Sequence, residues 1–451
     1  MENTPIKVGM ISLGCPKNQV DAEEMLAKLV GDGFTLTPHM DTADVVIINT
    51  CGFIEDAKKE SIENILEMGQ LKKEGTIRGI VVTGCLSERY FKEMRQEFPE
   101  VNCILQVGRA GDIADAVRAA NSGGTLDLSG RPESLANGGA RILTTLPFYS
   151  YLKIAEGCDN HCTYCIIPRL RGKYRSRPLE ELVREAEQLA AQGVRELTLV
   201  AQDTTRYGMD LYAGRKMLPE LLHRLCRIDG LHWVRVLYCY PEAITDELID
   251  TIASEEKVVP YIDMPIQHVS PRVVRAMNRR MSKEEILTLV GKLRARIPDV
   301  TLRTTLIVGF PGETEEEFSE LAAFVKETRF DRLGAFAYSQ EDGTPAANMP
   351  NQIDEDVKQQ RQERIVEEQM LVADQENEHR LGDTVEVLVE GYDRYAECHF
   401  GRSAAEAPEI DGKIFIRSKK KCRPGEFVSV HIDEVCGDDL LGCVEQGEMQ
   451  A

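Results

Sequence analysis

The densest group of potentially reactive side chains is a run of three cysteines, Cys158, Cys162 and Cys165, at the spacing CxxxCxxC. Three thiolates on one tight loop can hold three irons of a 4Fe-4S cluster, which leaves the fourth iron without a cysteine ligand. An open metal position is what a catalytic site needs in order to bind a substrate group. Zinc is the alternative, but His161 adjoins Cys162 and is badly placed to share its metal. The spacing therefore favours a catalytic iron–sulfur cluster, with His161 as a bystander.

Three more cysteines are far apart in the sequence but share one context. Cys15, Cys51 and Cys85 each follow a short apolar run, in SLGC, INTC and VTGC. If these runs are parallel strands, their carboxyl ends lie at one edge of a sheet, where ligands bind. Three structural thiols are the alternative, because a free cysteine packs as a small hydrophobe. The repetition at three strand ends favours a second three-cysteine cluster.

The first element series, residues 5–120, reads as an open parallel α/β sheet with alternating strands and helices. Its expected strands are short apolar runs of the kind buried in a parallel sheet, at Lys7–Leu13, Asp44–Thr50 and Ile77–Thr83. Residues 121–140 hold five glycines and three serines. That composition predicts an interdomain connection rather than a packed element.

Residues 141–380 carry a second strand–helix series, which predicts a partial (β/α)6 barrel of the TIM type, because right-handed crossovers curl successive strands the same way. Its six expected strands are Tyr151–Ala155, Glu196–Ala201, Trp233–Tyr238, Tyr261–Pro265, Leu302–Val308 and Leu333–Tyr338. A long polar helix is expected at Asp354–Arg380. Over residues 381–447 the hydrophobic pattern has period two, which predicts a small antiparallel β-barrel. The chain is thus expected to be an α/β multidomain protein.

The CxxxCxxC spacing, with Tyr164 before the last cysteine, resembles the radical S-adenosylmethionine (SAM) superfamily. The resemblance implies that the open iron chelates SAM and that reductive cleavage gives methionine and a 5′-deoxyadenosyl radical. Cysteine triplets in two places, followed by a small barrel of the TRAM type, look like the methylthiotransferase family of radical SAM enzymes. The likeness covers essentially the whole chain and makes Cys158, Cys162 and Cys165 catalytic.

Within this family, four segments most resemble the branch that modifies ribosomal protein S12: LGCPKNQVDAE, NTCGFIEDAKKESIENI, AQDTTRYGMDLY and YIDMPIQHVS. The likeness implies β-methylthiolation of one S12 aspartate to 3-methylthioaspartate, with two 4Fe-4S clusters per chain. One SAM would methylate the sulfur and a second would supply the radical that removes an unactivated hydrogen. An electron donor of the flavodoxin or ferredoxin type and a sulfur donor are implied as partners.

Several polar residues at expected strand ends are candidate contacts for SAM or substrate, because barrel active sites are built there. The pairs Gln202-Asp203 and Gln267-His268 have this position. Gly309-Phe310-Pro311-Gly312-Glu313 opens a helix, where backbone N–H groups can meet an anionic ligand, although a structural turn is equally compatible with it. Arg303 can meet a carboxylate or serve an internal ion pair. We therefore take Gln202, Asp203, Gln267, Arg303, Gly309 and Glu313 as candidate cofactor-binding residues.

Charge helps to choose between substrates. The chain has a formal net charge of −21, which argues against a broad phosphate-binding surface. Residues 381–451 contain 8 basic and 15 acidic residues, a net charge of −7. A barrel that grips tRNA should be basic, whereas an acidic one suits a basic ribosomal protein. A tRNA substrate is therefore disfavoured, with Lys419–Lys421 and Arg423 as the alternative of a local RNA patch.

Two expectations concern the setting of the protein. No run approaches the ~18 apolar residues that span a bilayer, and no signal peptide is evident, so a cytoplasmic location without membrane contact is expected. Thirteen cysteines then indicate metal or redox chemistry rather than disulfides. An electron-transfer module without SAM chemistry is the alternative from another class, but electron transfer does not require so large a barrel.

Overall fold

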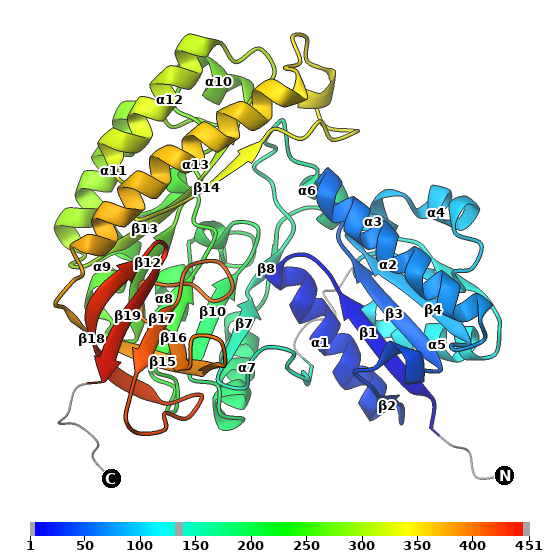
Figure 1. Ribbon diagram of the computed structural model, residues 1–451. Coiled ribbons are helices and arrows are strands. Elements are labelled where there is room, and N and C mark those ends of the chain that lie inside the picture. Colours follow the sequence, from blue (N-terminus) through cyan, green and yellow to red (C-terminus); the bar gives the residue numbers. More distant parts are fainter. Residues whose placement is uncertain (1–4, 131–138, 445–451) are drawn as a thin grey trace.

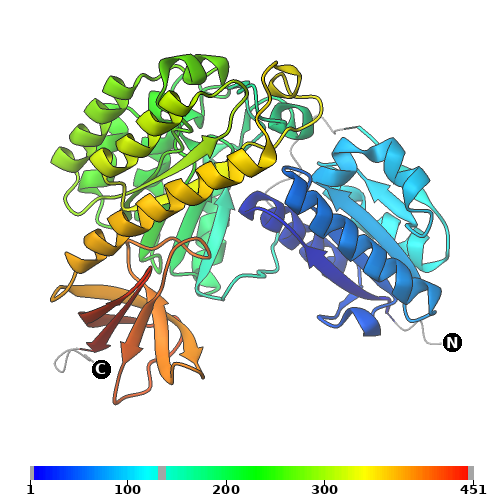
Figure 2. The same cartoon turned by 45° about the horizontal axis from the view of Figure 1, so that its top comes forward.

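The computed structural model describes residues 5–130 and 139–444, which form an N-terminal α/β domain, a central barrel and a small C-terminal barrel (Figure 1). The N-terminal domain lies to one side of the central barrel, and the C-terminal barrel packs beneath it (Figure 2). No helix in the described part of the chain is long and apolar enough to cross a membrane.

The N-terminal domain is a six-stranded parallel sheet in the order β2-β1-β3-β4-β5-β6. The strands are β1 (Lys7–Ser12), β2 (Thr35–Leu36), β3 (Val45–Thr50), β4 (Gly79–Gly84), β5 (Cys103–Leu105) and β6 (Leu126–Leu128). The helices are α1 (Pro16–Gly31), η1 (Met40–Thr42), α2 (Glu55–Lys73), α3 (Cys85–Arg89), α4 (Phe91–Glu97), η2 (Ala110–Asp112) and α5 (Ile113–Asn121). Separate apolar clusters cover the two faces, and β3 and β4 are wholly buried, as a parallel sheet requires.

The expected strands β1, β3 and β4 form the centre of this sheet, whereas β2, β5 and β6 were not expected. The prediction that residues 121–140 form an unpacked connection is wrong for β6, which is a strand of the sheet. Its residues Leu126 and Leu128 pack against the core although glycine and serine surround them. Turn residues mark where the chain bends, and here two leucines between the bends suffice for an edge strand. Residues 131–138 of the expected connection lie outside the described residues.

The central barrel has six parallel strands paired in chain order and open between the last and the first, as expected. They are β7 (Tyr149–Lys153), β10 (Glu196–Val200), β11 (Trp233–Val236), β12 (Val258–Asp263), β13 (Thr301–Val308) and β14 (Arg332–Ala337). The first strand ends earlier than expected, because β8 (Ala155–Glu156) pairs instead with β9 (Arg175–Ser176). This short hairpin closes the base of the loop that carries CxxxCxxC.

Helices cover the outside of the central barrel (Figure 1). They are α6 (Ile167–Arg171), α7 (Leu179–Ala191), η3 (Thr204–Arg206), α8 (Leu218–Cys226), η4 (Pro241–Ala243), α9 (Asp246–Ser254), α10 (Pro271–Ala276), α11 (Lys283–Arg296), α12 (Glu315–Thr328) and η5 (Ala346–Asn348). The capping box of Thr314 and Glu317 starts α12. The long polar helix α13 (Glu355–Glu378) runs along β14 and leads to the C-terminal barrel.

The C-terminal barrel is closed by five strands, in the order β15-β16-β17-β19-β18. They are β15 (Thr384–Asp393), β16 (Cys398–Arg402), β17 (Ile414–Arg417), β18 (Phe427–Cys436) and β19 (Asp439–Val444). Four pairings are antiparallel and the pairing of β17 with β19 is parallel. The small antiparallel barrel expected from the sequence is thus confirmed. Its one parallel pairing follows from the odd strand number, because strand directions can alternate all round a closed ring only when that number is even.

The segment 403–412 between β16 and β17, here called the plug, enters the amino-terminal end of the central barrel. Its Glu409 accepts hydrogen bonds from the hydroxyls of Tyr149 at 2.7 Å and Tyr151 at 3.2 Å. Its Asp411 accepts from the hydroxyl of Tyr261 at 2.7 Å. The plug therefore satisfies buried polar groups of β7 and β12, and its Ala407 packs in one apolar cluster with the same three tyrosines.

Candidate active site

The structure brings the three N-terminal cysteines to one edge of the sheet. Strands β1, β3 and β4 are neighbours in register, so Cys15, Cys51 and Cys85 follow their carboxyl ends together. Two glycines allow a close approach: a Cβ on Gly14 would lie 2.9 Å from Sγ of Cys51, and one on Gly52 would lie 2.9 Å from the carbonyl carbon of Cys85. Side chains at either glycine would push the strand ends apart.

Cations beside this triplet act on its thiols. Burial raises the pKa of the Cys15 thiol, but Lys17 and Arg171 outweigh burial, so that this pKa lies below its ordinary value. Burial raises the pKa of Cys51, and it raises that of Cys85 to about 11; Cys15 adds to both shifts. Three soft donors near enough to influence one another fit an iron–sulfur cluster, whose binding would displace protons from Cys51 and Cys85.

The second triplet lies on the loop between β8 and α6. The N–H of Cys158 donates to the carbonyl of Gly172 at 3.1 Å, and the N–H of Cys165 to that of Cys162 at 3.0 Å. The hydroxyl of Tyr240, beyond the end of β11, lies 3.0 Å from Sγ of Cys162. Burial raises the pKa of Cys158 to about 11. The three thiols of this loop lie near enough to interact electrostatically, and a cluster here would also release protons.

A cavity of about 370 Å³ adjoins this loop. Cys162, Cys165 and His161 line one side, and residues 343–345 with Asn348 line the other. Its volume lies in the range of small-molecule sites. Within residues 5–130 and 139–444, no three His, Cys, Asp or Glu side chains converge as for a single metal ion. A 4Fe-4S cluster differs from such a site because each cysteine ligates its own iron.

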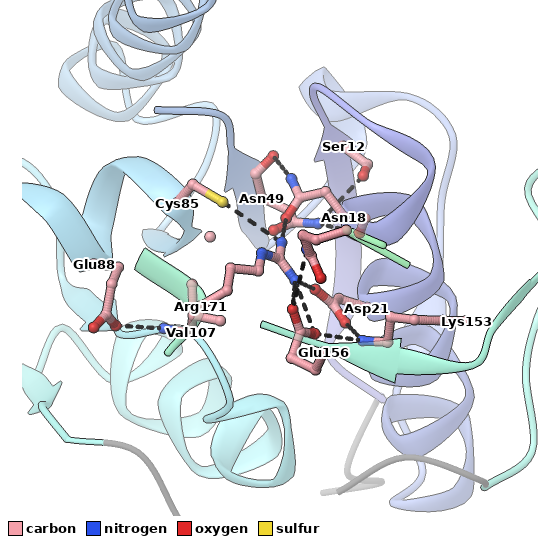
Figure 3. A network of polar contacts seen from close by, with 12 residues as sticks. Ser12, Asn18, Asp21, Asn49, Cys85, Glu88, Val107, Lys153, Glu156 and Arg171 are labelled. Atoms are coloured by element: carbon pink, nitrogen blue, oxygen red, sulfur yellow. Dashed lines mark hydrogen bonds and ion pairs between the residues drawn. The ribbon is translucent and has the colours of Figure 1, made fainter. Parts of the chain in front are cut away.

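Arg171, which sequence reasoning missed, points toward Cys85 of the N-terminal triplet (Figure 3). It ends α6, six residues after Cys165, and its Nη2 lies 3.5 Å from Sγ of Cys85. Cys85 also packs in one small buried cluster with Ile166 and Leu170. The helix after one cysteine loop therefore contacts a cysteine of the other triplet, and the only sequence signal was its position just after CxxxCxxC.

Two further contacts join the N-terminal domain to the central barrel. Nζ of Lys17 lies 3.5 Å from the ring centre of Tyr238, at the carboxyl side of β11. Glu341, two residues before the cavity-lining Gly343, pairs with Lys58 at 3.1 Å and with Arg89 at 2.5 Å. Lys17 stands two residues after Cys15, and this proximity in the sequence could have identified it as a residue of the site. These contacts fix the N-terminal triplet against the cavity side of the barrel.

Strained backbone marks the same side of the barrel. His161, Tyr238 and Gln267 have left-handed φ angles of 50°, 61° and 73°. Such conformations cost about 1–3 kcal/mol in non-glycine residues and gather at functional sites. Gln267 nevertheless keeps the ladder to β13, because its N–H donates to the carbonyl of Thr305 at 2.9 Å. Of the predicted contact residues, Gln267 is thus placed at a strained strand end.

The predicted pair Gln202 and Asp203 lies beside the cysteine loop. Asp203 is fully buried and accepts hydrogen bonds from Nδ2 of Asn160 at 2.8 Å and from the N–H of Thr205 at 3.1 Å. Since Asn160 belongs to the CxxxCxxC loop, Asp203 fixes that loop. Nε2 of Gln202 lies 3.4 Å from Glu156, and its Oε1 is buried without a partner among the described residues. That oxygen is an acceptor open to a ligand.

The turn at residues 309–313 packs against α13. A Cβ on Gly309, whose φ is 71°, would lie 2.4 Å from Cγ of Lys358. The buried carboxylate of Glu313 accepts from Arg361 at 3.1 Å, and burial raises the pKa of Glu313 to about 7. Gly309 and Glu313 therefore both have packing partners inside the protein. This arrangement agrees with the alternative of a structural turn, which the sequence left open.

The structure does not bring Arg303 to the cysteines. It lies in the amino-terminal half of β13, where it donates to Asp263 at 2.8 Å and lies 3.9 Å from Asp411 of the plug. Arg303 thus serves an internal ion pair, the second of the two roles that its sequence position allowed.

His268 is wholly buried beside the same turn. Its Nδ1 accepts the N–H of Ser270 at 3.0 Å, so Nε2 carries the proton, 3.9 Å from Glu313. Burial lowers the pKa of His268 to about 4. An unfolded histidine titrates near pH ~6.5, so between pH 6.5 and 4 only the unfolded chain takes up this proton. The stabilisation is complete above pH 6.5 and declines as the pH falls toward 4.

Substituting His268→Gln should remove this pH dependence. Between pH 7 and pH 5 the parent is expected to lose about 2 kcal/mol more of its free energy of unfolding than the variant, measured by urea denaturation. The exposed His39→Gln serves as the matched control and should keep the parent profile. Parallel profiles for the parent and the His268 variant would contradict the assignment.

Comparisons with known proteins agree with this geometry. Family models match the radical SAM superfamily over residues 152–325, the uncharacterized protein family UPF0004 over 7–106 and the TRAM domain over 381–444. Among solved structures, the radical S-adenosylmethionine methyltransferase TsrM from Kitasatospora setae, with cobalamin and a 4Fe-4S cluster bound, shares the fold. Its TM-score is 0.56 at 16% identity over 76% of this chain and 77% of that chain.

Curated relatives are similar over almost their whole length. The ribosomal protein uS12 methylthiotransferase RimO of Pelotomaculum thermopropionicum is 50% identical over 97% of this chain and 99% of its own. The protein of that name from Thermoanaerobacter sp. (strain X514) is 49% identical over 96% and 99%. Identity near 50% over the full length shows membership of one family and not only a shared fold. It confirms the resemblance to the methylthiotransferase family that the two cysteine triplets indicated. The chain therefore belongs to the RimO family of radical SAM methylthiotransferases.

Proposed function

We propose that the chain transfers a methylthio group to the β-carbon of one aspartate of ribosomal protein S12, giving 3-methylthioaspartate. SAM is both the methyl donor and the radical source. The observation that carries the proposal is the placement of two cysteine triplets on facing sides of one junction, next to a cavity. S12 is the substrate in the names of the relatives.

The residues fit two 4Fe-4S clusters, one on Cys158, Cys162 and Cys165 and one on Cys15, Cys51 and Cys85. Each set offers three cysteine donors and leaves one iron open. When bound, the first cluster supplies reductive cleavage of SAM, and the second supplies an iron on which the sulfur to be transferred is held. The protein itself fixes both loops, and the open acceptor Oε1 of Gln202 is a candidate contact for SAM.

Two small partners complete the proposal. A radical SAM reaction needs one electron at a time, for which a flavodoxin or ferredoxin is a suitable donor, and the transferred sulfur requires a separate donor. The setting is the cytoplasm, where ribosomal proteins are made and assembled.

Gln267, at its strained strand end, stays a candidate for SAM or substrate contact, whereas Asp203 holds the cysteine loop.

The experiment that tests the substrate is mass spectrometry of S12 from cells with and without this gene. A mass increase of one methylthio group on a single aspartate, present only with the gene, is expected. Unmodified S12 together with a methylthiolated tRNA adenosine would support the tRNA alternative instead. Reduction with dithionite in the presence of SAM tests the remaining alternative, since an electron-transfer module would form no 5′-deoxyadenosine.

Reversing exposed acidic residues on the C-terminal barrel should weaken S12 binding. Asp433, Glu434 and Asp438 are exposed, and their replacement by Lys changes the net charge of residues 381–451 from −7 to −1. Charge complementarity mainly speeds association, so the association rate with purified S12 should fall at least tenfold, measured by surface plasmon resonance. Asp439 is left intact because it accepts the N–H of Lys413 at 2.6 Å.

The matched control reverses three exposed acidic residues far from this barrel, Glu60, Glu63 and Glu67 on α2. That variant should bind S12 at the parent rate. Equal slowing in both variants would show that net charge, and not this barrel, matters. Deleting residues 381–451 is a poor substitute for this test, because the plug fills the central barrel.

A further inference from the structure

Arg171 is 1% exposed and lies in a polar network at the junction of the two domains (Figure 3). Its Nη1 donates to Asp21 of α1 at 2.9 Å and to both oxygens of Glu156 at 3.1 Å. Its Nη2 donates to Oδ1 of Asn18 at 3.1 Å and lies 3.5 Å from Sγ of Cys85. Four groups from three segments thus fix one guanidinium, which leaves it no freedom to turn away from the thiol.

The network draws its charges from both domains. Lys153 of β7 also contacts Asp21 and lies 3.1 Å from Glu156, so two cations face two carboxylates. Without Arg171, the two carboxylates and Lys153 would carry a net charge of −1. Arg171 brings the net charge of these four groups to zero. Buried cations need such partners. Of the two cations, Arg171 also contacts a cysteine of the N-terminal triplet, so its charge acts on that site as well as on the carboxylates.

We infer that Arg171 is a positioning residue that makes the cluster proposed on Cys15, Cys51 and Cys85 easier to reduce and fixes it against the barrel triplet. The inference rests on the proposed second cluster. Hydrogen bonds to the cluster's sulfur atoms and positive charge nearby raise the reduction potential of a cluster. Arg171 supplies both, and it does so from α6, the helix that follows the cysteines of the barrel triplet. The helix that follows the barrel triplet in sequence thus contacts the N-terminal triplet.

The experiment isolates the N-terminal cluster. In the full-length chain carrying Cys158→Ala, Cys162→Ala and Cys165→Ala, the cluster on the other triplet is reconstituted and its midpoint potential is measured by redox titration followed by electron paramagnetic resonance. Adding Arg171→Gln should shift the midpoint to more negative potential. Arg171→Lys keeps the charge and should recover most of that shift.

The matched control is Lys153→Gln, which removes a cation of equal burial from the same two carboxylates but has no contact with Cys85. It should move the midpoint much less than Arg171→Gln does. Because Arg171→Gln leaves carboxylates unpaired, the charge-balanced pair Arg171→Gln with Glu156→Gln is measured as well. It should still show a negative shift, smaller than that of Arg171→Gln because loss of the Glu156 charge offsets part of it.

An unchanged midpoint in the charge-balanced pair, or equal shifts in the Lys153 and Arg171 variants, would overturn the inference while leaving the cluster itself established. Failure of the parent with Arg171 intact to bind iron at Cys15, Cys51 and Cys85 would overturn both this inference and the proposed second cluster. The two failures are thus distinguishable before any activity is measured.

Discussion

A chain in which Cys158, Cys162 and Cys165 are replaced by Ala is expected to lose reductive cleavage of SAM completely and to keep about half of the parent's iron. The loop offers no substitute donor, because His161 adjoins Cys162 and has a left-handed backbone. The measurements are iron content after anaerobic reconstitution and 5′-deoxyadenosine formed with dithionite and SAM.

The reciprocal chain, with Cys15, Cys51 and Cys85 replaced by Ala, is its matched control. It should also keep about half of the iron, yet it should still form 5′-deoxyadenosine while methylthiolation of S12 disappears. The division follows from the structure, because the cavity borders the barrel triplet and the N-terminal cysteines leave a different sheet. Full iron content in either folded variant would refute the assignment of that triplet, and loss of SAM cleavage in the second would refute the division of labour.

The second large effect concerns stability. Arg402→Met should lower the free energy of unfolding by about 3–5 kcal/mol, measured by urea denaturation, because it breaks a buried ion pair. Arg402 is 1% exposed, and its guanidinium joins Glu196 of the central barrel at 2.9 Å to Glu390 of the C-terminal barrel at 2.6 Å. Without it, Glu196 keeps only Arg235, at 2.8 Å.

Arg417→Met is the control within the same small barrel. Arg417 pairs with Glu434 at 3.5 Å, and both side chains are more than half exposed. An exposed pair of this kind contributes about 0–1 kcal/mol. Similar losses in the two variants would mean that the ion pair between the barrels does not hold them together.

Much of this molecule could be predicted from local sequence. The apolar runs before Cys15, Cys51 and Cys85 predicted three neighbouring strands, because consecutive buried strands pair in parallel with their ends level. The six strands of the central barrel followed from the same pattern, and their chain order is the spatial order. Cysteine spacing located the barrel triplet, and the shared strand-end context located the N-terminal triplet, without any knowledge of tertiary contacts.

The remainder depends on contacts between residues far apart in the chain, which periodicity does not encode. Arg171 reaches Cys85 and Asn18 across more than 80 positions, and Arg303 meets the plug residue Asp411. From sequence alone, Arg303 has the same signature whether it binds a substrate carboxylate or an internal one. Short strands such as β2 were missed because two residues carry no detectable alternation.

The plug also has a consequence for synthesis of the chain. Arg235 donates to the carbonyl of Ala404 at 2.8 Å, and Arg332 and Arg380 pair with Glu406 at 3.4 Å and 2.6 Å. Arg332 and Arg380 precede Glu406 in the sequence, so they lack this counter-charge until the plug is made, whereas Arg235 already pairs with Glu196. Translation at ~5–20 residues per second delivers the plug only seconds later. The contacts that hold the plug in the central barrel therefore form last, after the C-terminal domain has been synthesised.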